Sequence, residues 1–203
     1  MAIEEIVSEL NENGFYKFQT PFVNKSDVED LRFLLKPHLE KADDEYLFGK
    51  AARVGPYQAW RPTPIYSLFS SPVIQGIAEG FYKKTPSFNE IFATHEFRND
   101  QGLERNGFLH FDRIPTLKFF LYLTPVDRNC GAFNYVPGSY KLGTQLRTAS
   151  NAETDEYGKI KNRLEIDFPD LGYTKQNAVP VEGDAGTMFI FHSDLFHYGG
   201  TIE

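Results

Sequence analysis

The stretch GFLHFDRIPTLKFFLYLTPV, residues 107–126, decides the predicted fold, because it joins a His-x-Asp triplet to a hydrophobic run. Residues i and i+2 of an extended strand point to the same face, so His110 and Asp112 can contact one ion together while Phe111 points the other way into packing. The triplet alone is a weak signal, because a hydrogen-bonded surface pair has the same pattern. Whether the triplet binds a metal therefore depends on which other residues the fold places beside it.

From Phe88 onward, short strand-like runs alternate with turn residues. The runs are NEIFATHEF (89–97), GFLHFD (107–112), TLKFFLYLTPV (116–126), GAFNYVPGS (131–139) and NAVPVEGDAGTMFIFHSDLFHYGG (177–200). This pattern predicts an antiparallel sandwich or barrel. Residues 141–172 interrupt the pattern with a charged segment, where we expect a loop and one surface helix.

The first third of the chain is predicted to be helical with breaks. Apolar residues at helical spacing predict a helix from Ile3 that stops at Asn13-Gly14, followed by a short extended piece. A second amphipathic run follows residues 24–27 and is ended or bent by Pro37, and Pro72 begins a third helix.

Residues 43–66 have no clean period and are rich in Gly, Pro, Arg and aromatic residues, which predicts a long loop. Within this loop Arg53, Tyr57, Trp60 and Arg61 combine cations with aromatic rings. Such stretches are typical of lids over active sites, but a loop that only covers the barrel has the same composition. Both interpretations remain open.

Composition limits the class of protein. The chain has 203 residues, 41% of them hydrophobic, which predicts one domain with a sizeable core. A formal charge of −7 argues against nucleic acid or an anionic membrane surface as a partner. The single cysteine, Cys130, cannot form an internal disulfide. The first ten residues, MAIEEIVSEL, do not have the pattern of a secretory signal, and no apolar run is long enough to span a bilayer. We therefore expect a cytoplasmic protein.

A second strand near the end of the sequence adds another metal-ligand type. GTMFIFHSD (186–194) is followed by His197 and then by Gly199-Gly200. Two imidazoles and one carboxylate on one face of a metal form the facial triad of non-haem Fe(II) oxygenases, which leaves coordination positions open. His192 is the alternative to His197, but strand parity aligns it with Met188 and Ile190, so we favour His197.

An ordered set of motifs then resembles the phytanoyl-CoA dioxygenase family of 2-oxoglutarate-dependent oxygenases. The set comprises His-x-Asp at 110–112, Leu-Thr-Pro-Val-Asp at 123–127, Gly and Pro-Gly-Ser within 131–139, Gly-Asp at 183–184, and a distal His followed by Gly. The stretch GFYKFQTPFVNKSDVEDLRFLL (14–35) also resembles the opening strand and helix of the family. The resemblance therefore covers nearly the whole chain.

The resemblance implies a mainly β fold, a double-stranded β-helix (jelly roll) with flanking α-helices. It also implies that His110, Asp112 and His197 are the catalytic and metal-binding residues and that they hold Fe(II). The implied reaction is oxidative decarboxylation of 2-oxoglutarate by dioxygen, coupled to hydroxylation of a small molecule. An aspartate at the carboxylate position favours hydroxylation, because halogenating relatives have a small residue there.

The sequence departs from the family pattern at its end. Relatives place an Arg on the last strand, beyond the distal His, where it pairs with the far carboxylate of 2-oxoglutarate. We therefore expect residues 1–203 to be a single oxygenase domain that is incomplete at its C-terminus. Lys118 is the candidate replacement, because it shares strand parity with Phe120, which matches a position where relatives place an aromatic side chain in the pocket. A surface lysine is the alternative.

Two other functions remain open. The chain could be a cupin-like metal enzyme that does not use 2-oxoglutarate, or a catalytically inactive jelly-roll binding protein. Metal analysis separates the binding protein from both enzymes.

Overall fold

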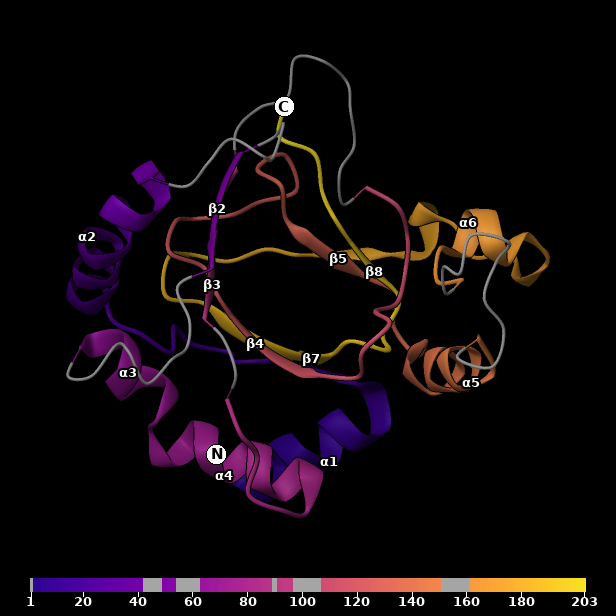
Figure 1. Ribbon diagram of the computed structural model, residues 1–203, viewed down its shortest axis with the longest axis horizontal. Coiled ribbons are helices and arrows are strands. Elements are labelled where there is room, and N and C mark those ends of the chain that lie inside the picture. Colours follow the sequence, from indigo (N-terminus) through magenta and orange to yellow (C-terminus); the bar gives the residue numbers. More distant parts are fainter. Residues whose placement is uncertain (1, 42–48, 54–62, 89–90, 97–106, 151–160) are drawn as a thin grey trace.

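Two antiparallel sheets of three strands face each other across a core of aromatic side chains (Figure 1). The structure is a computed structural model, and it describes residues 2–41, 49–53, 63–88, 91–96, 107–150 and 161–203. One sheet has the order β1 (Phe15–Lys17), β7 (Met188–His192), β4 (Leu117–Leu121). The other has the order β6 (Val179–Val181), β5 (Phe133–Tyr135), β8 (His197–Gly199).

Strand β7 is the middle strand of its sheet, and all five of its residues are buried. Phe189 and Phe191 point between the sheets, where the ring centroid of Phe133 lies 5.2 Å and 4.4 Å from theirs. Ile190 points the other way, into a cluster with residues of the helices. A strand covered on both faces has a continuous apolar run rather than an alternating one, which explains the sequence MFIFH.

Two helices cover the outer face of the β1-β7-β4 sheet (Figure 1). Helix α1 (Ile3–Asn13) ends at Gly14, whose φ of 69° is left-handed, as the Asn13-Gly14 pair predicts. Helix α4 (Pro72–Tyr82) begins with a proline in its first turn, also as predicted. The outer face of this sheet is therefore closed, and its inner face is the one available for a site.

The smallest sheet corrects one prediction. Strands β2 (Gly49–Arg53) and β3 (Phe92–Glu96) pair antiparallel, with Gly49 opposite Glu96 and Arg53 opposite Phe92. Strand β2 lies inside the stretch 43–66, for which the sequence predicted only a loop. Near it, α2 (Lys25–Lys41) contains Pro37 and continues past it, and α3 (Pro64–Phe69) follows.

The segment between β5 and β6 contains more helix than expected. It forms α5 (Tyr140–Ser150) and α6 (Leu164–Asp167), followed by 3-10 turns at Pro169–Leu171 and Lys175–Asn177. Over the described residues, helices contain more of the chain than strands do. The antiparallel sheets were predicted correctly, but the helical content was underestimated. None of the described helices is both long and apolar enough to cross a bilayer.

Candidate metal centre

His110, Asp112 and His197 come together at the inner side of the two sheets. Their possible ligand atoms all lie within 4.8 Å of one another, and no second group of this kind occurs among the described residues. Oδ1 of Asp112 is 3.7 Å from Nε2 of His110 and 3.8 Å from Nε2 of His197. The three side chains that the sequence singled out are therefore neighbours.

Backbone pairing places the two histidines side by side. The N–H of His110 donates to the carbonyl of His197 at 3.0 Å, and the N–H of His197 donates back at 2.8 Å. His110 forms only isolated bridges, so GFLHFD is not the regular strand that was predicted. Phe111 is nonetheless fully buried, and the alternation of faces across 110–112 holds.

Hydrogen bonds orient both imidazole rings. Nδ1 of His110 lies 2.7 Å from the carbonyl oxygen of Phe108, and Nδ1 of His197 lies 2.6 Å from that of Leu195. A carbonyl oxygen can only accept, so each Nδ1 carries the hydrogen and each Nε2 keeps its lone pair. Those lone pairs belong to the atoms nearest the Asp112 carboxylate, which is the tautomer that metal binding requires.

Burial keeps the two histidines neutral. It lowers the pKa of His197 from 6.5 to about 3, and it also lowers the pKa of His110. Burial by itself would raise the pKa of Asp112, but His197, the Lys118 ammonium and His110 together bring that pKa below its ordinary value. At neutral pH the centre therefore offers two neutral nitrogens and one carboxylate.

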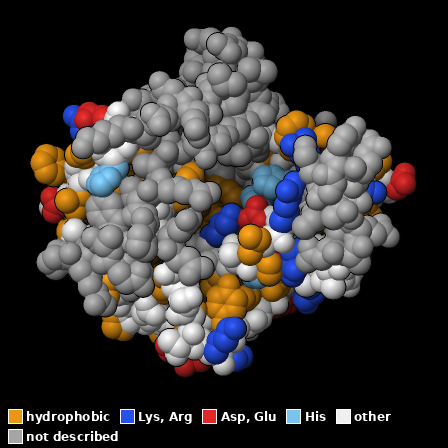
Figure 2. All heavy atoms as spheres, in the orientation of Figure 1, with side chains coloured by type: hydrophobic (Ala, Val, Ile, Leu, Met, Phe, Trp, Pro, Cys, Tyr) orange, Lys and Arg blue, Asp and Glu red, His pale blue; other side chains and the backbone are white. Residues whose placement is uncertain are grey.

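Lys118 points into this centre rather than away from it. Its Nζ is 2.5 Å from Oδ2 of Asp112 and 5.5 Å from the ring centroid of Phe191. The Lys118 side chain is 42% exposed and the Asp112 side chain 25%, so the pair is open to water on one side. Figure 2 shows cationic, acidic and histidine side chains gathered in the hollow at the middle of this face. The Lys118 ammonium therefore contacts one of the three candidate metal-ligand residues.

Phe120 lies on the same face of β4 as Lys118, two residues further along. Its ring stacks on Phe189 with centroids 5.1 Å apart and lies 6.1 Å from that of Phe133. Phe120 thus belongs to the aromatic wall between the sheets. Strand parity placed both β4 side chains correctly.

His192 lies on the opposite face of β7. Its ring is 5.6 Å from that of Phe81 in α4, on the helical side of the sheet, and 5.1 Å from that of Tyr140, the first residue of α5. His192 is not part of the His110-Asp112-His197 group. The structure therefore groups His197, and not His192, with His110 and Asp112.

Three of the predicted lid residues, Tyr57, Trp60 and Arg61, lie outside the described residues. The fourth, Arg53, is the last residue of β2. His95 lies in β3 and is exposed, apart from the metal-ligand group.

Sequence reasoning missed a buried ion pair next to the centre. Nε of Arg147 lies 2.5 Å from Oδ1 of Asp194, and Nη2 lies 3.0 Å from Oδ2. A signal was present, because Asp194 stands inside the apolar run MFIFHSDLF, where a charge requires a partner. The local sequence did not identify Arg147 as that partner.

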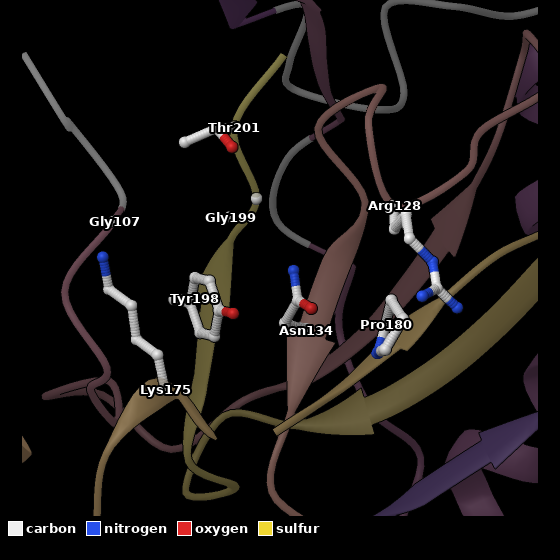
Figure 3. Close-up of a pocket in the computed structure, with 9 residues that line it drawn as sticks. Gly107, Arg128, Asn134, Lys175, Pro180, Tyr198, Gly199 and Thr201 are labelled. Atoms are coloured by element: carbon white, nitrogen blue, oxygen red, sulfur yellow. The ribbon is translucent and has the colours of Figure 1, made fainter. Parts of the chain in front are cut away.

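A cavity of about 390 Å³ lies on the other side of the β6-β5-β8 sheet (Figure 3). Asn134, Tyr198 and Lys175 help to line it. Asn134 and Tyr198 alternate along their strands with Phe133 and His197, which face inward. The sheet therefore separates this cavity from the candidate metal centre.

Comparison with known proteins gives one family and many similar folds. The family described as Phytanoyl-CoA dioxygenase (PhyH) matches residues 12–203. Comparison with curated protein sequences gives no match.

Three solved structures illustrate the similarity in fold. The epimerase SnoN, in complex with Fe3+, alpha ketoglutarate and nogalamycin RO, has a TM-score of 0.65 at 14% identity, over 98% of this chain and 77% of SnoN. EctD from S. alaskensis with bound Fe has a TM-score of 0.61 at 11% identity, over 98% and 70% of the two chains. HygX from Streptomyces hygroscopicus, with nickel, 2-oxoglutarate and hygromycin B bound, has a TM-score of 0.57 at 15% identity, over 100% and 82%. At these identities the likeness establishes the fold.

Proposed function

The chain belongs to the phytanoyl-CoA dioxygenase family, and from this premise we propose that it is an Fe(II)- and 2-oxoglutarate-dependent oxygenase that hydroxylates a small molecule. The arrangement of His110, Asp112 and His197 carries the proposal. Two neutral Nε2 atoms and a carboxylate converge on one point, and the two Nδ1 atoms are occupied by backbone carbonyls. This donor set fits a facial triad for Fe(II).

Each residue has a defined part in holding the cofactor. His110 and His197 would supply nitrogen ligands, and Asp112 would supply the carboxylate. Bound there, Fe(II) supplies the redox chemistry by which dioxygen decarboxylates 2-oxoglutarate and oxidises a C–H bond of the substrate. Three protein ligands leave positions for 2-oxoglutarate and dioxygen.

Lys118 is proposed to bind 2-oxoglutarate. In the present structure its ammonium balances the charge of Asp112. Once a divalent cation balances that carboxylate instead, the flexible lysine side chain can turn to another anion. We propose that this anion is the carboxylate of 2-oxoglutarate far from the metal, and that Phe120 forms the adjoining apolar wall.

The proposed architecture is a double-stranded β-helix with flanking helices, formed by residues 1–203 as one oxygenase domain. The two facing antiparallel sheets and the similar solved structures support it. The solved structures of SnoN and HygX contain small organic molecules, nogalamycin RO and hygromycin B respectively, which supports a small-molecule substrate here. The acidic charge balance argues against nucleic acid and membrane partners, and the single cysteine is consistent with the cytoplasm.

Metal content and co-substrate turnover test the proposal. Protein prepared metal-free and loaded with Fe(II) without oxygen should hold one iron per chain and form succinate from 2-oxoglutarate when oxygen is admitted. The His197→Ala variant should lose both properties. The His95→Ala variant, with an exposed histidine of β3 removed, should keep both and serves as the matched control.

The remaining outcomes identify the two alternatives. One iron per chain without any succinate would indicate a cupin-like metal enzyme. A folded protein that takes up no iron would indicate a jelly-roll binding protein without catalysis.

A further inference from the structure

We propose that Arg147 and Asp194 are positioning residues for the candidate metal centre. Their ion pair holds the β7–β8 turn, Ser193–Phe196, in the position from which Asp112 and His197 are oriented. The inference rests on the proposed function, because it requires that a metal binds at this centre.

The ion pair of Arg147 and Asp194 is buried and is joined at two points. Two parallel hydrogen bonds join the Arg147 guanidinium to the Asp194 carboxylate, at 2.5 Å and 3.0 Å. The Asp194 side chain is fully buried and that of Arg147 is 14% exposed. A two-point contact between planar groups fixes direction as well as distance, which a lysine could not do.

The turn that carries Asp194 contacts two of the three metal-ligand residues directly. The carbonyl of Ser193, immediately before Asp194, accepts the backbone N–H of Asp112 at 2.8 Å. The carbonyl of Leu195, immediately after it, accepts from Nδ1 of His197 at 2.6 Å. A movement of Asp194 therefore displaces both acceptors, and with them the carboxylate and one imidazole.

Helix α5 clamps the same turn at further points. A Cβ atom at Gly143 would lie 1.8 Å from the backbone oxygen of Asp194, so the helix backbone rests directly against the turn. Oγ of the buried Ser139, just before α5, accepts the N–H of Phe196 at 2.9 Å. Arg147 is thus one element of a contact that links α5 to the metal ligands.

Nothing in this arrangement requires Arg147 or Asp194 to touch a metal or a substrate. Neither residue belongs to the metal-ligand group. Side chains that hold metal ligands from outside alter metal affinity about 10- to 100-fold when they are replaced. The effect of this pair should therefore be visible in metal binding itself, before any turnover.

The test measures binding of Co(II) to folded, metal-free protein, by the visible absorption of the bound ion. Arg147→Met and Asp194→Asn should each weaken Co(II) binding about tenfold or more and change the absorption spectrum, and Arg147→Lys should fall between them and the unaltered protein. Arg128→Met is the matched control, because Arg128 forms an exposed ion pair with Glu182 at 3.3 Å. That variant should keep the affinity within about twofold.

A double variant separates positioning from stability. Arg147→Met combined with Asp194→Asn leaves no buried charge without a partner, so its melting temperature should recover relative to the single variants. Its Co(II) affinity should stay low, because the two-point contact is still missing. Recovery of both properties would mean that the pair only stabilises the fold, and would overturn the proposal.

Two further outcomes are decisive. Folded Arg147→Met with the affinity and spectrum of the unaltered protein would overturn the inference, whereas an unaltered protein that binds no Co(II) would overturn the proposed function. If no variant folds, hydrogen exchange of the unaltered protein decides. Co(II) should slow exchange in α5, which holds no ligand, and unchanged exchange there would refute the coupling.

Discussion

Replacement of Lys118 by methionine should have two effects of opposite sign. Without a metal, the Lys118 ammonium is the counter-charge of Asp112, with Nζ 2.5 Å from Oδ2. A divalent cation that binds Asp112 must displace this ammonium, so its removal should strengthen metal binding. The same removal should weaken 2-oxoglutarate binding, because the far carboxylate loses its cation.

The structure sets the size of each effect. Exposed ion pairs contribute about 0.2–1 kcal/mol and the loss of one partner from a buried pair costs about 3–5 kcal/mol. The Lys118 side chain is 42% exposed, so water screens its ion pair with Asp112. The contribution of this pair therefore lies near that of an exposed pair. About 1 kcal/mol corresponds to roughly fivefold tighter metal binding. A hydrogen bond to a charged group contributes about 1.5–3 kcal/mol, so 2-oxoglutarate binding should weaken about 10- to 150-fold.

Two titrations measure these effects. Co(II) is titrated into metal-free Lys118→Met, and 2-oxoglutarate is then titrated into the Co(II)-loaded protein without oxygen. Lys175→Met is the control, because Lys175 lines the cavity on the other side of the β6-β5-β8 sheet. Unchanged 2-oxoglutarate affinity would refute the assignment of Lys118 to the co-substrate. Weaker Co(II) binding would refute the displacement argument and show that the lysine orients Asp112 in the loaded protein.

Three shorter predictions follow from the same geometry. Metal-free protein should become less stable as the pH falls below 6.5, because the unfolded chain protonates His197 while burial holds its folded pKa at about 3. The free energy of unfolding, measured in urea with EDTA present, should fall by about 2 kcal/mol between pH 8 and pH 5 through His197. A His197→Asn variant with the same pH dependence would contradict this assignment. At saturating Co(II), His197→Ala should lose the bound ion and His192→Ala should retain it, and the reverse result would make His192 the ligand. Gly143→Ala should lower the free energy of unfolding by about 1–3 kcal/mol, because its Cβ would collide with the backbone of Asp194, and an unchanged urea midpoint would show that α5 does not rest on the turn.

The candidate site could be predicted because its chemistry is local in sequence. His110 and Asp112 lie two residues apart, and His197 follows the strand-like run GTMFIFHSD by three residues, where the structure makes it the first residue of β8. Parity along regular strands then separated inner from outer side chains. Parity grouped Lys118 with Phe120 and His192 with Met188 and Ile190. The structure then places Lys118 beside Asp112 and His192 beside Phe81. Side chains alternate between the two faces along any regular strand, and a buried face fixes the register.

Features that depend on distant partners were not predicted. Strand β2 has the sequence GKAAR, which has low strand propensity, and it forms by pairing with β3, some forty residues later. Helix α2 passes through Pro37 because the proline removes only one backbone donor, while Val28, Leu31 and Leu35 anchor the helix in the core. Tertiary packing outweighs local preference in both cases. The partner of Asp194 was missed because Arg147 lies 47 residues away in the sequence, and no local pattern relates the two residues.

The two ion pairs of the site differ in a way that matches their proposed roles. Lys118 meets Asp112 through one ammonium, at a pair that water reaches, so a bound cation can replace the lysine at modest cost. Arg147 meets Asp194 through two hydrogen bonds at a fully buried carboxylate, where loss of the partner leaves a charge that no solvent stabilises. A ligand carboxylate needs an exchangeable counter-ion, whereas a turn that orients ligands needs a fixed one. Each of two single substitutions, Lys118→Arg and Arg147→Lys, should therefore weaken metal binding to the centre. Lys118→Arg should hold Asp112 too firmly, and Arg147→Lys should let the β7–β8 turn move.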